Sequence, residues 1–168
     1  MNEKLAEALN KQLNAELYSA YLYLSMAAYF DSLGLKGFAN WMKAQAEEEV
    51  GHAMKIYKYL DDRGARVVLE AVEKPPTEWE NPRHAVEELL EHERRVTGMI
   101  NALVKMAKEE DDYATEVFLQ WFIEEQVEEE ASAAELLDMM RWAGDKGHSL
   151  LMIDRQLAQR KPKFLSTE

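Results

Sequence analysis

Three residues in the first half of the chain could bind a metal ion together. Glu49 and His52 form a Glu-x-x-His pair, which places a carboxylate and an imidazole on the same face of a helix. Glu16 precedes this pair by 33 residues and offers a further carboxylate. Carboxylate oxygens with one imidazole suit iron or manganese, and also zinc. The first half of the sequence therefore offers one metal site.

The second half of the chain repeats these intervals with a weaker set of ligands. Gln126 and Glu129 follow Glu93 by 33 and 36 residues, the same intervals as in the first half. The two halves are otherwise little alike, so the repeat is one of structure. Two helical hairpins related by a pseudo-twofold axis would bring the two half-sites face to face. Four glutamates in one dry core repel each other, and two divalent cations would balance their charge of about −4.

Four long helices and one short helix are expected to carry these residues. Three of the helices are followed by glycine, and an Asn-Pro pair opens the third, which are usual stop and start signals. The predicted helices span residues 3–33, 36–63, 81–109, 111–143 and 145–159. The last eight residues, KPKFLSTE, are expected to be loose.

The link between the second and third helices determines the predicted topology. It runs from Gly64 to about Asn81, some 18 residues, whereas the other links between long helices are short. Extended, such a link reaches up to about 59 Å, which exceeds the length of about 42 Å of a 28-residue helix. We therefore expect it to run the length of the bundle, so that the helices it joins are parallel. Its VVLEAV segment is apolar enough to lie along a surface, such as that of a partner subunit.

Each long helix carries an apolar stripe that polar residues interrupt near the middle. The apolar positions of the stripes include Leu9, Leu13, Ala20, Tyr23, Ala27, Phe30, Phe38, Met42, Ile56, Tyr59, Val86, Leu89, Val96, Ile100, Leu103, Leu119, Phe122, Ala133, Leu136 and Met140. The interruptions are the candidate ligands of the two half-sites. Because four helices are interrupted at the same level, we expect one polar cluster at the centre of the bundle, with no inward Lys or Arg to neutralise it.

Composition excludes several functional classes. The 168 residues contain 32 acidic and 20 basic side chains, a net charge of −12 that repels nucleic acid and anionic membranes and attracts cations. The absence of cysteine excludes disulfides, iron–sulfur clusters and thiolate nucleophiles. The longest uncharged run, over residues 17–30, is too short and too polar to span a bilayer. With a polar N-terminus as well, we expect one cytoplasmic domain over residues 1–168, with no membrane or nucleic-acid partner.

The sequence resembles the ferritins, specifically the non-haem bacterial type, over essentially its whole length. The segments that carry the resemblance are NAELYSAYLY, QAEEEVGH, EHERRVT and FLQWFIEEQVEEE. The resemblance implies an all-α, ferritin-like four-helix bundle over about residues 3–143, with a long crossover and a short fifth C-terminal helix. It also implies iron storage and detoxification in a 24-subunit shell. In that shell a ferroxidase would oxidise Fe(II) to Fe(III) with O₂ at a di-iron centre and deposit ferric oxyhydroxide.

The resemblance also assigns roles to individual residues. The first iron site matches Glu16, Glu49 and His52, and the second matches Glu93, Glu129 and Gln126. Glu49 would bridge the two ions. A third iron site of prokaryotic ferritins matches Glu48, Glu125 and Glu128. Tyr23 matches a tyrosine that assists electron transfer in the family, and Trp121 is expected to be close to the centre.

Two differences from related proteins favour a ferritin that stores iron and has no haem. Bacterioferritins and rubrerythrins have a second Glu-x-x-His where this chain has Gln126 and Glu129. The second site therefore lacks imidazole, and we interpret it as a transit site that feeds a store. Val50 stands where bacterioferritins have a haem-ligating methionine, so no haem is expected.

Several alternatives stay open at this point. A non-storage di-iron oxidase or peroxidase, like rubrerythrin or bacterioferritin, would use the same ligands, and a metal-free structural bundle would leave the carboxylates unexplained. Either O₂ or H₂O₂ could be the preferred oxidant. Gln126 could be a hydrogen-bonding core amide, and the run EEQVEEE could be a solvated acidic face. His84, His92 and His148 fall on no ligand stripe and are expected at the surface.

Overall fold

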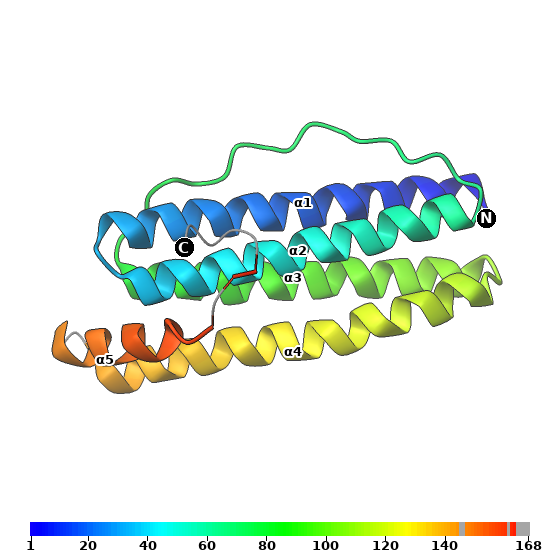
Figure 1. The fold of residues 1–168 in the computed structure, drawn as a ribbon. Helices are drawn as coiled ribbons and strands as arrows, with labels where there is room; N and C mark the ends of the chain where they lie inside the picture. The colour runs from blue at the N-terminus through cyan, green and yellow to red at the C-terminus, as the bar shows by residue number, and fades with distance from the viewer. Residues whose placement is uncertain (145–146, 161, 164–168) are drawn as a thin grey trace.

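The structure, a computed structural model, describes residues 1–144, 147–160 and 162–163. Its described residues form the helices α1 (Glu3–Ser32), α2 (Lys36–Asp62), α3 (Pro82–Glu109), α4 (Tyr113–Ala143) and α5 (Gly147–Leu157). The first four lie side by side as a bundle, and α5 packs at the end where α4 finishes and α2 begins (Figure 1). The prediction of an all-α four-helix bundle with a short fifth helix is confirmed.

The helices begin and end close to the predicted signals. Asn81 caps α3 by accepting a hydrogen bond from the backbone N–H of His84, and proline follows it in the first turn. Gly34 and Gly64 have φ of 76° and 67°, a left-handed conformation that favours glycine. The fourth helix begins at Tyr113 rather than at residue 111, because Asp112 is its cap and accepts from the N–H of Thr115. The predicted start of the last helix, at residue 145, lies outside the described residues.

The crossover over residues 63–81 runs along α1 for the length of the bundle, so that α2 and α3 are parallel (Figure 1). Asparagine side chains of α1 hold it in place. Asn10 Nδ2 donates to the carbonyl of Arg66, 3.1 Å away, and Asn14 Nδ2 donates to the carbonyls of Glu70 and Ala71. The apolar segment predicted to lie along a surface rests on α1, with Leu69 63% exposed.

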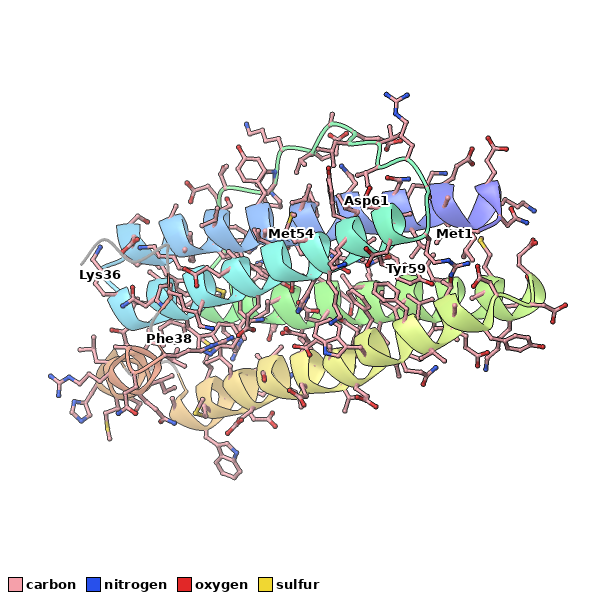
Figure 2. The ribbon with its side chains drawn as sticks, turned by 45° about the vertical axis from the view of Figure 1, so that its right-hand side comes forward. Met1, Lys36, Phe38, Met54, Tyr59 and Asp61 are labelled. Atoms are coloured by element: carbon pink, nitrogen blue, oxygen red, sulfur yellow. The ribbon has the colours of Figure 1, made fainter. Side chains whose placement is uncertain are left out.

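The apolar interior consists of two clusters toward opposite ends of the bundle. One contains Phe38 and Met42 near α5, and the other contains Leu9 and Ile56 near the N-terminus. Figure 2 shows Phe38 beside α5 and Tyr59 toward the opposite end. Every residue of the predicted stripes is buried except Tyr59, which is half-buried. None of the helices in the described ranges has a stretch long and apolar enough to cross a membrane.

Candidate metal centre

The six candidate ligands of the two half-sites come together between the two apolar clusters. All six are buried, with at most 5% of each residue exposed. They come from all four long helices, namely Glu16 from α1, Glu49 and His52 from α2, Glu93 from α3, and Gln126 and Glu129 from α4. The interrupted stripes therefore meet at one level, which is why each helix has polar residues there.

The first half-site is built by α1 and α2. Ligand atoms of Glu16, Glu49 and His52 lie within 4.8 Å of one another. His52 Nδ1 is 3.2 Å from Glu49 Oε2 and 4.0 Å from Glu16 Oε2. Gln12 Nε2 donates to the other oxygen, Glu16 Oε1, at 2.7 Å.

One carboxylate oxygen of this half-site is suited to bind a cation. Glu16 Oε2 is buried and has no hydrogen-bond partner among the described residues. A buried carboxylate oxygen without a partner is unfavourable, since native proteins pair or ligate nearly all such groups. With the ligand atoms of Glu49 and His52 beside it, that oxygen completes a set of three donors that fits a divalent cation such as iron.

The second half-site is built by α3 and α4, with Glu49 shared. Ligand atoms of Glu49, Glu93 and Glu129 lie within 4.8 Å of one another. Glu49 therefore belongs to both groups, as a bridging ligand must. Tyr23 donates its phenolic hydrogen to Glu93 Oε1, and Gln45 Nε2 donates to Glu129 Oε2 at 2.6 Å.

Gln126 acts here as a hydrogen-bond donor. Its Nε2 lies 3.2 Å from the carbonyl oxygen and from Oε2 of Glu93, and 3.2 Å from Thr97 Oγ1. The amide thus orients a carboxylate of the site, in agreement with the alternative that it is a core amide. Direct ligation by Gln126 requires its oxygen to turn into the site and stays a prediction.

Three carboxylates of the metal-free layer hold protons more tightly than usual, because their pKa values are raised. Burial, followed by the charges of Glu16 and Glu93, raises the pKa of Glu49 well above its ordinary value. Burial raises the pKa of Glu93 to about 7, although hydrogen bonds from Tyr23 and Gln126 act in the opposite direction. Burial and the charge of Glu93 raise the pKa of Glu129 to about 8. Cations that enter this layer therefore replace protons, and relieve the repulsion between the carboxylates.

The three residues predicted for a third site do not form one ligand group within the ranges that the structure describes, although Glu48 and Glu125 line the same groove. Glu125 Oε1 lies 3.7 Å from His52 Nε2 and forms a group with Glu129. Glu48 is paired with Arg160, whose Nη2 is 2.7 Å from Glu48 Oε2, and Glu128 is exposed. In the described part of the chain, neither Glu48 nor Glu128 belongs to a three-residue ligand group.

A groove between α2 and α4 leads toward the centre from the surface. Its volume is about 730 Å³, and His52, Lys55, Trp121 and Glu125 are among its lining residues. The Trp121 ring lies edge-on to His52, with centroids 5.4 Å apart, as its predicted closeness to the centre requires. Lys55 Nζ lies 4.1 Å from the centre of the Trp121 ring.

Sequence reasoning missed three kinds of residue at this site. Gln12 and Gln45 support carboxylates, and each lies four residues before a candidate ligand on the same helical face, which is a signal that the sequence contained. Arg160 gave no such signal. The prediction for His92 was wrong: it is 7% exposed because α1 covers that side of α3, and it contacts Ser19. His84 is half-exposed and His148 exposed.

The family comparison agrees with this geometry. A family profile described as the ferritin-like domain matches residues 6–142, which is most of the bundle. The chain belongs to the ferritin family. The predicted resemblance is therefore confirmed, and this ferritin has the buried carboxylates and imidazole that iron binding requires.

Similar ferritins are found in bacteria and archaea. The bacterial non-heme ferritin of Bacteroides fragilis is 45% identical over 160 residues, covering 95% of this chain and 99% of the relative. That of Staphylococcus saprophyticus is 40% identical over 160 residues, covering 95% and 96%. The open pore ferritin of the hyperthermophilic archaeon Archaeoglobus fulgidus superposes with a TM-score of 0.95 at 55% identity, covering 96% of this chain and 99% of that one. As a non-haem ferritin, the protein stores iron and is a ferroxidase.

Proposed function

We propose that this ferritin oxidises Fe(II) in pairs, at two adjacent sites in each subunit, and stores the Fe(III) as ferric oxyhydroxide inside a shell of 24 copies. The observation that carries the proposal is that Glu16 Oε2 is buried without a hydrogen-bond partner among the described residues, in a layer with three further buried glutamates. Among the described residues, no Lys or Arg side chain pairs with any of these four carboxylates. Two Fe(II) ions would supply the missing positive charge.

We assign separate roles to the residues that bind the ions and to the residues that orient the ligands. Glu16, Glu49 and His52 bind one Fe(II), and Glu93 and Glu129 bind the other, with Glu49 between them. Gln12 and Gln45 keep their carboxylate partners oriented. Iron is the substrate and supplies the electrons, two from each pair of Fe(II), to O₂ or H₂O₂. Glu49, Glu93 and Glu129, whose pKa values are raised, release their protons when the ions enter.

The oxidised ions leave through the groove between α2 and α4. Glu125 stands next to His52 and Glu129 at the inner end of this groove. The second site has no imidazole, which favours transit over permanent binding. A third ion at Glu48, Glu125 and Glu128 would have to displace Arg160 from Glu48.

Exposed apolar side chains support assembly into a shell. Trp142 is 92% exposed, Val117 is 72% exposed and Leu69 is 63% exposed in the isolated chain. We propose that these side chains become buried between subunits of the shell. We further propose that residues 1–168 act as one ferritin domain, that the shell binds no haem, and that it works in the cytoplasm without nucleic-acid or membrane partners.

Aerobic iron loading followed by size-exclusion chromatography tests the proposal. We expect Fe(II) oxidation far faster than in buffer, elution at the size of a 24-mer, and uptake of hundreds of ions per shell. A dimer that takes up only two ions per chain would instead identify a non-storage oxidase or peroxidase. Oxidation no faster than in buffer would overturn both readings. Glu124→Gln, at an exposed position of α4, is the matched control for Glu49→Gln.

A further inference from the structure

We infer that Tyr18, His92 and Tyr23 form a path along which single electrons reach the iron centre from a pocket between α1, α3 and the crossover. The inference rests on the proposed ferroxidase function and adds to it a route and a class of external electron donor. It gives a role to His92, a buried imidazole outside the ligand set.

The inner end of the path is Tyr23. Its ring is fully buried, and its hydroxyl donates to Glu93 Oε1 in the second half-site. A phenol loses an electron most readily when its proton can leave at the same time. The hydrogen bond to Glu93 supplies the proton acceptor, so Tyr23 is placed to give one electron to the centre.

The middle of the path is the His92 ring. It lies between two tyrosines, with its centroid 5.9 Å from that of Tyr23 at an interplanar angle of 88° and 5.9 Å from that of Tyr18 at 53°. These are ordinary contact distances between aromatic rings. His92 therefore joins two phenols that do not stack on each other.

Ser19 fixes the orientation of that ring. Its Oγ donates to the carbonyl of Ala15 at 3.1 Å and lies 2.7 Å from His92 Nε2. Ser19 and His92 thus share one hydrogen bond, and the tautomer of the imidazole decides which of the two donates. This directional bond holds the imidazole between the contacts with Tyr18 and Tyr23.

The outer end of the path opens to solvent. Tyr18 is half-buried and lines a pocket of about 450 Å³. The other lining residues used here are His92, Arg95 and Met99 from α3 and Glu73 from the crossover. The guanidinium of Arg95 favours a small anion, and the rings and Met99 favour a flat, partly apolar one. A one-electron donor of the ascorbate or hydroquinone-carboxylate class fits this chemistry.

The path is needed when a centre holds a single Fe(II). Reduction of O₂ by two Fe(II) ions yields H₂O₂, and H₂O₂ takes two electrons and two protons to become two waters. A single Fe(II) gives one electron and becomes Fe(III). Tyr23 gives the second, becomes a phenoxyl radical and passes its proton to Glu93, while solvent supplies the two protons for water. Without this second electron the oxidant would attack the protein.

An external electron donor then reduces the tyrosyl radicals. Tyr18 gives an electron through the His92 ring to the Tyr23 radical, which takes its proton back from Glu93. The phenolic proton of Tyr18 leaves to solvent in the pocket. A donor in the pocket finally returns a hydrogen atom to the Tyr18 radical and leaves as its own radical. Each step conserves atoms and charge, and no residue is consumed.

Radical mapping on the intact shell tests the path. Shells loaded without oxygen with one Fe(II) per subunit are mixed with H₂O₂ in the presence of a nitroso spin trap, and adducts are located by mass spectrometry. We expect adducts on Tyr18 and not on Tyr21, a half-exposed tyrosine of the same helix. In His92→Leu the adduct on Tyr18 falls at least about tenfold, because the ring that contacts both phenols is gone. The radical signal of buried Tyr23, measured by electron paramagnetic resonance, then lasts longer.

Three further samples make the outcome decisive. Tyr18→Phe keeps the ring but loses the oxidisable phenol, so the radical should stay on Tyr23. His84→Leu, at a half-exposed histidine of the same helix, should label as wild type does. Ascorbate should shorten the life of the radical in wild type and less so in Arg95→Gln, with Arg94→Gln as the matched control.

Failure of the path differs from failure of the proposed function. Equal labelling of Tyr18 and Tyr21, or unchanged labelling of Tyr18 in His92→Leu, overturns the path while Fe(II) oxidation by O₂ continues. If the wild-type shell does not accelerate that oxidation at all, the ferroxidase proposal fails, and the path fails with it.

Discussion

The main-chain carbonyl oxygen of Asp154 lies against Gly37, where it leaves no space for a side chain. A Cβ at position 37 would stand 1.7 Å from that oxygen. Asp154 Oδ1 also accepts a hydrogen bond from the backbone N–H of Phe38 at 3.0 Å, and α2 has no side-chain cap of its own. The α5 helix therefore caps the first turn of α2 with an acidic group, which also suits the helix dipole.

Gly37→Ala should destabilise the subunit, although alanine normally stabilises a helix. The clash with Asp154 forces α5 away, and overpacking of this kind costs about 1–3 kcal/mol. The matched control is Gly98→Ala in α3, where a Cβ meets nothing within 4 Å. That change should stabilise by about 0.5–1 kcal/mol. Thermal unfolding of both variants measures the difference, and shifts of the same sign would contradict the close contact.

Glu49→Gln should abolish rapid Fe(II) oxidation while leaving the shell assembled. Glu49 belongs to both three-residue ligand groups, so its loss weakens both sites at once. Loss of groups that only orient ligands costs about 10–100-fold, and loss of the shared ligand should cost at least as much. Stopped-flow absorbance measures the rate, and size-exclusion chromatography measures assembly. An oxidation rate equal to that of the Glu124→Gln control would show that Glu49 is not a ligand of the centre.

Metal-free shells should lose stability as the pH rises. The folded-state pKa of Glu93 is about 7 and that of Glu129 about 8, both above the ordinary value of 4.5. A raised pKa means that the folded protein binds the proton more tightly, so this stability is present below about pH 4.5 and is lost as the pH passes 7 and 8. Glu129→Gln should flatten the upper part of the decline. Calorimetry in chelator measures it, and a flat wild-type curve between pH 5 and 8 would contradict the burial of these carboxylates.

The ion pair between Arg63 and Asp112 at the start of α4 should lose its stabilising effect as the pH falls, which is the opposite direction. The Arg63 hydrogen bonds, against the effect of burial, lower the pKa of Asp112 from 3.8 to about 2. A lowered pKa means that its contribution is present above about pH 4 and is lost as the pH falls through 2. Asp112→Asn should therefore lower the melting temperature at pH 7 much more than at pH 2. Asp62→Asn, in an exposed pair with Lys58, should change it little at either pH.

The sequence was informative where local spacing decides the structure. Glycines and the Asn-Pro pair mark helix ends because their backbone preferences act within a few residues. The candidate ligands could be found because a polar residue in an apolar stripe is unfavourable unless it binds something. Glu16 and Glu93 could be identified only by comparing the two halves of the chain, since each is followed at the same intervals by a pair of candidate ligands.

Long-range packing explains what the sequence could not predict. His92 precedes Glu93 and looks like an outward residue by periodicity, yet α1 lies close enough to cover both. Arg160 reaches Glu48 because the chain after α5 returns to α2, a contact between residues more than a hundred positions apart. Neither relationship follows from helical spacing, since each depends on how separate elements sit against each other.

The separation of the interior into two apolar clusters has a consequence for what ion binding does to stability. The Phe38 cluster and the Leu9 cluster pack on either side of the acidic layer, where buried carboxylates repel one another. Cations bound in this layer would replace that repulsion with attraction between the four long helices. Ion binding should therefore join the two apolar halves of the subunit and raise its melting temperature.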